Sequence, residues 1–124
     1  MVWKFGKRNR RVVSLNRLVY LISPSIIYKN FYNDLENVLT SKKVKFFQLR
    51  LKKILKNKII KISKKIKIIT KKYKVKFIIN DSLVTTKITN ADGCHIGQLD
   101  GSIKEAKKYL KNKILGVTCH NSKK

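Results

Sequence analysis

Two short apolar runs in this sequence end in polar residues that can hold a phosphate or a metal ion. Phe77–Ile79 is followed by Asn80 and Asp81, and the run around His95 and Ile96 is followed by Asp100. An apolar run bounded by turn residues predicts a buried strand, as in a parallel sheet. Carboxylates from two neighbouring strand ends suit Mg²⁺ held against a substrate phosphate. The sequence therefore predicts a magnesium site at Asp81 and Asp100.

A third polar group lies at the end of another predicted strand. Gln48, Arg50 and Lys52 are spaced two apart, so in an extended strand all three side chains point to the same side. On an exposed edge strand they would form a solvated face. At the end of a barrel strand they would direct an amide, a guanidinium and an ammonium group into one pocket.

Five predicted strands alternate with four predicted helices, and this order favours parallel pairing with right-handed crossovers. The polar clusters then lie at one rim, as in a (β/α) barrel, although a closed barrel needs eight strands. We therefore predict an α/β fold, a partial (β/α) TIM barrel over residues 17–124 after a basic lead-in over residues 1–16. The predicted strands are Leu18–Ile22, Val44–Leu49, Val75–Ile79, Cys94–Ile96 and Ile114–Thr118; the helices are Tyr28–Val38, Leu55–Tyr73, Leu83–Thr89 and Ser102–Leu110.

The charge is strongly unbalanced, with 31 Lys+Arg against 6 Asp+Glu and a net charge of +25. Such a charge favours polyanions, including nucleic acid and anionic lipid. Lys, Ile and Asn are enriched together, however, as AT-rich coding DNA would produce. The lysines are also not interleaved with aromatic residues as in nucleic-acid platforms. We expect no specific nucleic-acid partner and no membrane partner.

The two cysteines, Cys94 and Cys119, do not form a disulfide framework, which favours a reduced, cytoplasmic protein. Each precedes a histidine, but the spacing of these pairs matches no zinc module. The apolar run Leu18–Ile22 is too short to cross a membrane.

Four motifs, in this order, resemble the successive rim motifs of thiamine-phosphate synthase and its TenI-like relatives. The resemblance extends from about Leu18 to Asn121. The motifs are Gln48-Leu49-Arg50-Leu51-Lys52, Phe77-Ile78-Ile79-Asn80-Asp81, the run from Ala91 to Asp100, and Gly116-Val117-Thr118-Cys119-His120-Asn121.

The resemblance implies a TIM-barrel transferase that joins hydroxymethylpyrimidine pyrophosphate to thiazole phosphate and releases pyrophosphate. It implies that Arg50 and Lys52 are catalytic residues that hold the pyrophosphate, and that Asp81 and Asp100 bind Mg²⁺ as the cofactor. The substrate-binding residues it implies are Gln48, Arg50, Lys52, Asn80, His95, Gln98 and Thr118.

The sequence also departs from the family. Members have three further strands, which carry a Thr/Lys-containing loop for pyrophosphate and glycine-rich nests for the thiazole phosphate. We therefore expect a truncated or decaying gene product of doubtful activity, a fragment completed by another polypeptide or by self-association, or a partial gene model. One alternative is a TenI-like thiazole tautomerase, which does not need the residues that bind pyrophosphate and Mg²⁺. The other is a basic nucleic-acid- or membrane-surface-binding fragment. For Asp81, the simpler alternative is a structural cap.

Overall fold

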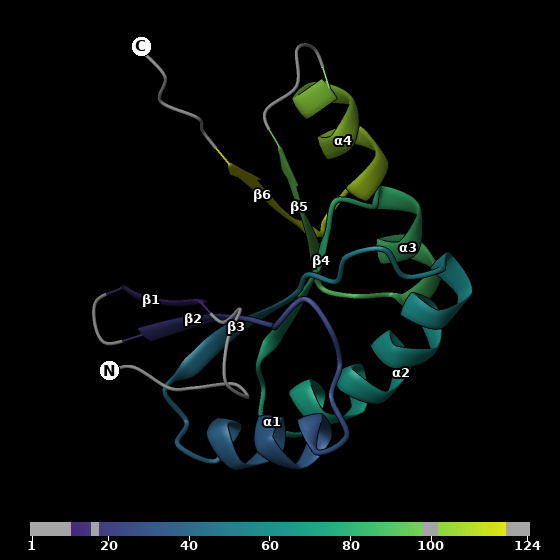
Figure 1. Ribbon diagram of the computed structural model, residues 1–124. Coiled ribbons are helices and arrows are strands. Elements are labelled where there is room, and N and C mark those ends of the chain that lie inside the picture. The colour runs from purple at the N-terminus through teal and green to yellow at the C-terminus, as the bar shows by residue number, and fades with distance from the viewer. Residues whose placement is uncertain (1–10, 16–17, 98–101, 119–124) are drawn as a thin grey trace, which may run out of the picture.

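The computed structural model describes residues 11–15, 18–97 and 102–118, and its strands form one curved sheet in the order β1 to β6 (Figure 1). β1 pairs antiparallel with β2, and the pairs from β2 to β6 are parallel. The helices lie along one face of the sheet, as in half of a (β/α) barrel. The strands are β1 (Arg11–Leu15), β2 (Leu18–Ile22), β3 (Val44–Leu49), β4 (Lys76–Asn80), β5 (Gly93–Gly97) and β6 (Ile114–Thr118); the helices are α1 (Phe31–Leu39), α2 (Lys56–Lys72), α3 (Leu83–Thr89) and α4 (Ser102–Leu110).

The five parallel strands and four crossover helices confirm the predicted partial barrel. The strand β1 is an addition, because the sequence analysis predicts only a lead-in there. Its register places Leu15 opposite Leu18. The two residues between these strands, Asn16 and Arg17, lack the glycine that usually marks a two-residue hairpin, so the sequence carries no clear signal for this pairing.

The main core lies between the sheet and the first two helices. Phe47 and Phe77, from neighbouring strands, are completely buried, and their ring centroids are 6.4 Å apart. Every second strand residue points to the helices because side chains alternate along a strand. α1 presents its apolar residues three and four positions apart, which places them on one side of the helix. The residues of these elements that form this core are Val19, Leu21, Phe31, Leu35, Val38, Leu39, Val44, Phe47, Leu49, Ile66, Phe77 and Ile79.

A smaller core under β5 and β6 is separate from the first. Cys94 and Ile96 of β5 pack there against Ala106 and Leu110 of α4. Burial raises the pKa of the Cys94 thiol, and the side chain acts as a small apolar group. This cluster fixes the position of the strands whose opposite face carries His95.

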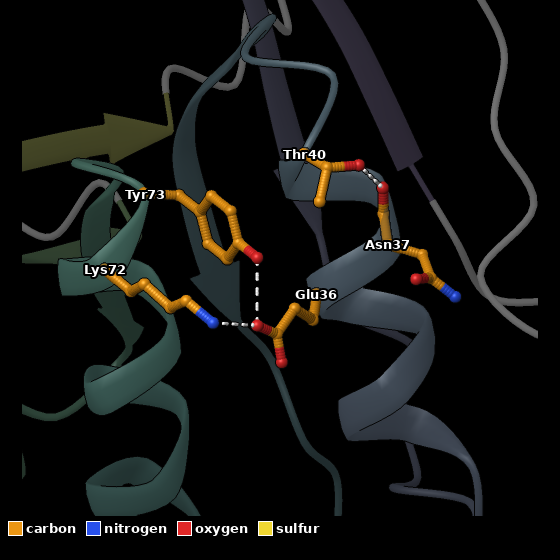
Figure 2. A network of polar contacts seen from close by, with 5 residues as sticks. All are labelled: Glu36, Asn37, Thr40, Lys72 and Tyr73. Carbon is orange, nitrogen blue, oxygen red and sulfur yellow. Dashed lines mark hydrogen bonds and ion pairs between the residues drawn. The ribbon is translucent and has the colours of Figure 1, made fainter.

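Glu36 joins α1 to the end of α2 (Figure 2). Its Oε2 accepts hydrogen bonds from Lys72 Nζ at 2.6 Å and from the Tyr73 hydroxyl at 2.9 Å. These two donors lower the pKa of Glu36. Beside this link, the Thr40 hydroxyl donates to the Asn37 carbonyl at 2.6 Å and helps to end α1.

None of the helices in the described ranges is long and apolar enough to cross a membrane.

Replacing Lys42 by glycine should stabilise the fold. Lys42 follows α1 with a φ of 62°, and its N–H donates to the Leu39 carbonyl at 3.1 Å. Glycine adopts this left-handed conformation without the Cβ penalty. We expect Lys42→Gly to raise the free energy of unfolding by about 1 kcal/mol in urea denaturation, with an unchanged m-value.

Lys45→Gly is the matched control, because Lys45 is exposed within β3. Glycine in a strand interior costs roughly 0.5–1 kcal/mol, so this variant should be destabilised. Destabilisation of both variants would contradict the conformation assigned to Lys42.

Candidate functional site

The carboxyl ends of β3 to β6 meet at one rim of the half-barrel. Parallel pairing aligns Asn80 with His95, and Gly97 with Thr118. The helices lie along one face of the sheet (Figure 1). The side chains that alternate with the helix-facing core residues belong to the other, open face. Four predicted site residues belong to this open face: Gln48, Asn80, His95 and Thr118.

Gln48 places a buried amide on the open face. The side chain is only 2% exposed, and its Nε2 donates to the Tyr20 hydroxyl at 3.0 Å. The Tyr20 ring stacks on Phe46, with centroids 5.4 Å apart, so the acceptor of this hydrogen bond is held in place. Within the described part of the chain, Gln48 Oε1 has no hydrogen-bond partner. An unpaired buried acceptor costs free energy, and a ligand N–H would remove that cost.

Arg50 and Lys52 follow β3, which ends at Leu49, so strand alternation no longer determines their direction. The Arg50 N–H donates to Ser23 Oγ at 2.9 Å, and Ser23 is buried. This bond fixes the backbone of Arg50 while its side chain is exposed. Lys52 is also exposed, and its N–H donates to the Ser25 carbonyl at 3.2 Å. The predicted approach of the Lys52 ammonium to the site stays a prediction.

Asp81 lies directly after β4 in a left-handed conformation, with a φ of 63°. Its N–H donates to the His95 carbonyl at 2.7 Å, which ties the tip of β4 to β5. The carboxylate is not the cap of α3, because Ser82 Oγ accepts the hydrogen bond from the Thr85 N–H at 3.1 Å. Asp81 is exposed at the rim. Asp81 is therefore not the N-cap of α3, and the alternative of a turn cap stays a prediction.

His95 connects the tips of three strands. Its Nε2 is within hydrogen-bonding distance of Thr118 Oγ1 on β6, and the ring lies over Gly116, where an added Cβ would be 2.8 Å from Nδ1. Burial lowers the pKa of His95, and the positive charge of Arg50 lowers it further, while the carboxylate of Asp81 opposes both effects. The charges of Arg50 and Asp81 thus have opposite effects on the same imidazole ring.

The rim carries a guanidinium, a carboxylate and uncharged hydrogen-bonding groups, contributed by Arg50, Asp81, Gln48, Asn80, His95 and Thr118. Asn80 is half-buried at the end of β4. Gln98 and Asp100, two further predicted site residues, lie outside the described residues. The described ranges hold no cluster of three or more His, Cys, Asp or Glu residues suited to a metal ion. Mg²⁺ commonly uses only one or two carboxylates together with substrate phosphates, and the exposed oxygens of Asp81 fit that pattern.

Three residues that support the site were not predicted. Tyr20 holds Gln48, Ser23 holds the backbone of Arg50, and Gly116 leaves room for the His95 ring. A glycine within the apolar strand β6 is a sequence signal for close approach of another group. The roles of Tyr20 and Ser23 depend on contacts between strands, which the sequence pattern does not specify.

The profile of the thiamine monophosphate synthase family matches residues 19–124. The chain is 61% identical over 108 residues to the thiamine-phosphate synthase of Pelagibacter ubique, covering 86% of this chain and 52% of that protein. It is 38% identical over 108 residues to the thiamine-phosphate synthase of Erythrobacter litoralis, covering 85% of this chain and 51% of the relative. The chain thus spans about half the length of the curated relatives it matches.

A solved structure supports the fold. The thiamine phosphate pyrophosphorylase from Pyrococcus furiosus superposes with a TM-score of 0.63 at 24% identity, over 70% of this chain and 43% of that one. The strands and helices described above therefore have the arrangement of about half of that larger protein.

The pKa of His95 should report on both charged neighbours. We expect Arg50→Gln to raise this pKa, because a nearby positive charge disfavours the imidazolium. Asp81→Asn should lower it, since the favourable negative charge is lost, and asparagine tolerates the left-handed conformation. The measurement is an NMR titration of the His95 ring in the presence of a chelator, with the signal assigned by His95→Gln. If the pKa of His95 is unchanged in both variants, the charges of Arg50 and Asp81 do not act on the ring.

Gly116→Ala should displace the His95 ring, because the new methyl group would lie 2.8 Å from Nδ1. We expect the pKa of His95 to rise towards 6.5 as the ring becomes more exposed, and the NMR coupling to Thr118 to be lost. Gly97→Ala is the matched control on the same face, since its added Cβ meets nothing within 4 Å. Equal effects of the two substitutions would show that the ring does not lie over Gly116.

Proposed function

The chain belongs to the thiamine monophosphate synthase family, and from this premise we propose that it serves in the synthesis of thiamine phosphate. In this reaction the hydroxymethylpyrimidine group is transferred from its pyrophosphate ester to thiazole phosphate, and pyrophosphate is released. The observation that carries the proposal is the shared rim of the parallel strands, where His95 contacts Thr118 and its pKa responds to the charges of Arg50 and Asp81.

We propose that the described half-barrel binds the pyrimidine pyrophosphate. Gln48 would orient the ring, since its Oε1 can accept an N–H from the pyrimidine. His95 and Thr118 would line the same open face. The Tyr20 contact holds the amide before substrate arrives, and a preorganised acceptor loses little conformational freedom on binding.

The charged groups would act on the leaving group. As the bond between the pyrimidine methylene and the pyrophosphate breaks, negative charge develops on the pyrophosphate. Arg50 can make a two-pronged contact to phosphate oxygens, and Lys52 can supply a point charge. Fixed charges that meet a developing charge are commonly a large part of catalysis. The bond from Arg50 N–H to Ser23 gives this guanidinium a fixed backbone.

We propose that Mg²⁺ is the cofactor and that Asp81 holds it, with Asp100 as the second carboxylate. When bound, Mg²⁺ supplies charge neutralisation on the pyrophosphate. The role of Asn80 would be to bind a phosphate oxygen from its place beside Asp81. This assignment rests on the exposed carboxylate at the tip of β4 and on the fact that another residue caps α3.

The rest of the barrel would have to cover the open face and supply the thiazole phosphate site. In the described sheet, β6 is the last strand in the order and pairs only with β5. A further parallel strand can therefore add to β6, whichever polypeptide supplies it. Two copies of this chain repel each other because each has a net charge of +25. A segment of different sequence therefore suits the edge of β6 better than a second copy.

Binding of hydroxymethylpyrimidine pyrophosphate should depend on Mg²⁺ and on Asp81. We expect Asp81→Asn to weaken binding on the order of tenfold or more with Mg²⁺, as the loss of a charged contact does, and to have little effect without it. Arg50→Gln should weaken binding with or without Mg²⁺. Isothermal titration calorimetry with the chain measures both effects.

Glu105→Gln is the control for Asp81→Asn, because it removes one exposed carboxylate from α4 and changes the net charge equally. Lys45→Gln is the corresponding control for Arg50→Gln. Equal weakening in a variant and its control would indicate general electrostatic attraction and contradict the proposed site.

A further inference from the structure

A pocket lies at the opposite end of the sheet from the candidate functional site. It has a volume of about 510 Å³ and is bounded by the end of α2, the start of β4 and the turn after α3. Lys76 and Asn80 mark the two ends of β4. The four residue steps between them separate the pocket from the rim by roughly 13 Å. We call this site the lysine pocket; its lining residues are Lys67, Thr70, Lys71, Lys74, Val75, Lys76, Asn90 and Asp92.

Positive charge dominates the lysine pocket. Four of its eight lining residues are lysines, and the single carboxylate among them belongs to Asp92. That carboxylate already accepts a hydrogen bond from the Phe77 N–H at 2.7 Å. One carboxylate cannot neutralise four ammonium groups, so the pocket keeps an excess of positive charge. Its size is in the range of small-ligand sites.

Two ammonium groups are held in place beside the turn after α3. Lys67 Nζ donates to the Asn90 carbonyl at 2.6 Å. Lys113 Nζ donates to Asn90 Oδ1 at 2.7 Å and to the Ala91 carbonyl at 2.6 Å. Asn90 adopts a φ of 54°, which places its side chain and its carbonyl group within reach of these two lysines. The positive groups are thus partly ordered before any ligand binds.

The electrostatics around Lys113 agree with an uncompensated positive site. Burial lowers the pKa of Lys113, and the charges of Lys67 and Lys87 lower it further, while Asp92 opposes them. The end of α2 favours cations because the helix dipole is negative there. This effect explains how several lysines can gather at this place, but it provides no counter-ion that would fill the pocket.

We infer that the lysine pocket binds a compact anion that carries several phosphate groups, at a site separate from the rim. Lysine binds phosphate as a point charge, and several ammonium groups around a concave site can contact one oligophosphate together. A polynucleotide suits the site less well, because single strands bind along grooves with aromatic side chains for stacking, and no aromatic residue lines this pocket.

The test measures binding of inorganic triphosphate to the chain by calorimetry, without Mg²⁺ and with a chelator present. The variant Lys71→Gln/Lys74→Asn removes two exposed lysines at the end of α2, and asparagine is chosen because Lys74 has a φ of 59°. We expect affinity to fall on the order of tenfold or more. NMR shifts on binding should occur at the amides of residues 74–76 and 90–92.

The chain contains a closely matched control at the end of α4. Lys108→Gln/Lys111→Asn removes two lysines with the same spacing, and Lys111 is also left-handed, with a φ of 58°. This variant should keep its affinity within about threefold. Thermal unfolding of both variants verifies that they fold. In Arg50→Gln, the NMR shifts at residues 74–76 and 90–92 should persist, which separates this site from the proposed pyrophosphate site.

Four results would overturn the inference. The first is the absence of triphosphate binding by the unmodified chain. The second is equal weakening by the two double variants, which would indicate diffuse attraction. The third is tighter binding of a single-stranded oligonucleotide with the same dependence on Lys71 and Lys74, which would assign the surface to nucleic acid. The fourth is loss of the NMR shifts at residues 74–76 and 90–92 in Arg50→Gln, which would show that these shifts depend on the rim and contradict a separate site.

Discussion

Parallel pairing from β2 to β6 is the constraint on which the candidate site depends. Because all five strands run in one direction, their carboxyl ends meet at a single rim, although the residues there are far apart in sequence. Alternation along each strand then separates two faces. Phe47 and Phe77 point to the helices and form the core, while Gln48 and Asn80 belong to the open face. Local strand geometry therefore produces both the core and the site.

Much of this fold could be predicted because its signals are local. The spacing of apolar residues in α2 and the apolar runs of β3 and β4 follow directly from helix and strand periodicity. β1 was missed because its pairing with β2 depends on a hairpin without a recognisable turn sequence. The side-by-side placement of Gln48, Arg50 and Lys52 was predicted by extending β3, but the strand ends at Leu49, and strand ends are set by tertiary contacts such as that between Ser23 and Arg50.

The site was predictable as a set of residue types, but not as a set of contacts. Asp81 and Gln48 could be selected because each follows or ends an apolar run. The hydrogen bond from Gln48 to Tyr20 joins residues 28 positions apart, and no periodicity in one strand reveals its partner in the next. The space over Gly116 likewise depends on the ring of His95 from β5. Such contacts follow from register, which becomes visible only when the sheet is assembled.

Because this chain has few carboxylates, each one matters for offsetting the repulsion among the basic side chains. With 31 basic and 6 acidic residues, folding must overcome repulsion among the lysines. Glu36 counters this repulsion where α1 meets α2. Asp92 organises the amino ends of three strands: its carboxylate accepts from the Phe77 N–H, its N–H donates to the Phe77 carbonyl at 2.9 Å, and its carbonyl accepts from the Ile114 N–H at 2.9 Å.

Asp81 differs from the structural carboxylates of Glu36 and Asp92 in its contacts, its backbone conformation and its position. Its side chain makes no hydrogen bond with the described residues, its backbone is left-handed, and it lies at the carboxyl end of its strand. In parallel α/β folds, polar residues at that end commonly serve function, whereas those at the amino end serve stability. The structural role of Asp92 and the role proposed for Asp81 thus lie at opposite ends of β4. The left-handed conformation, which costs most residues about 1 kcal/mol or more, is explained if the carboxylate must reach a ligand at the rim.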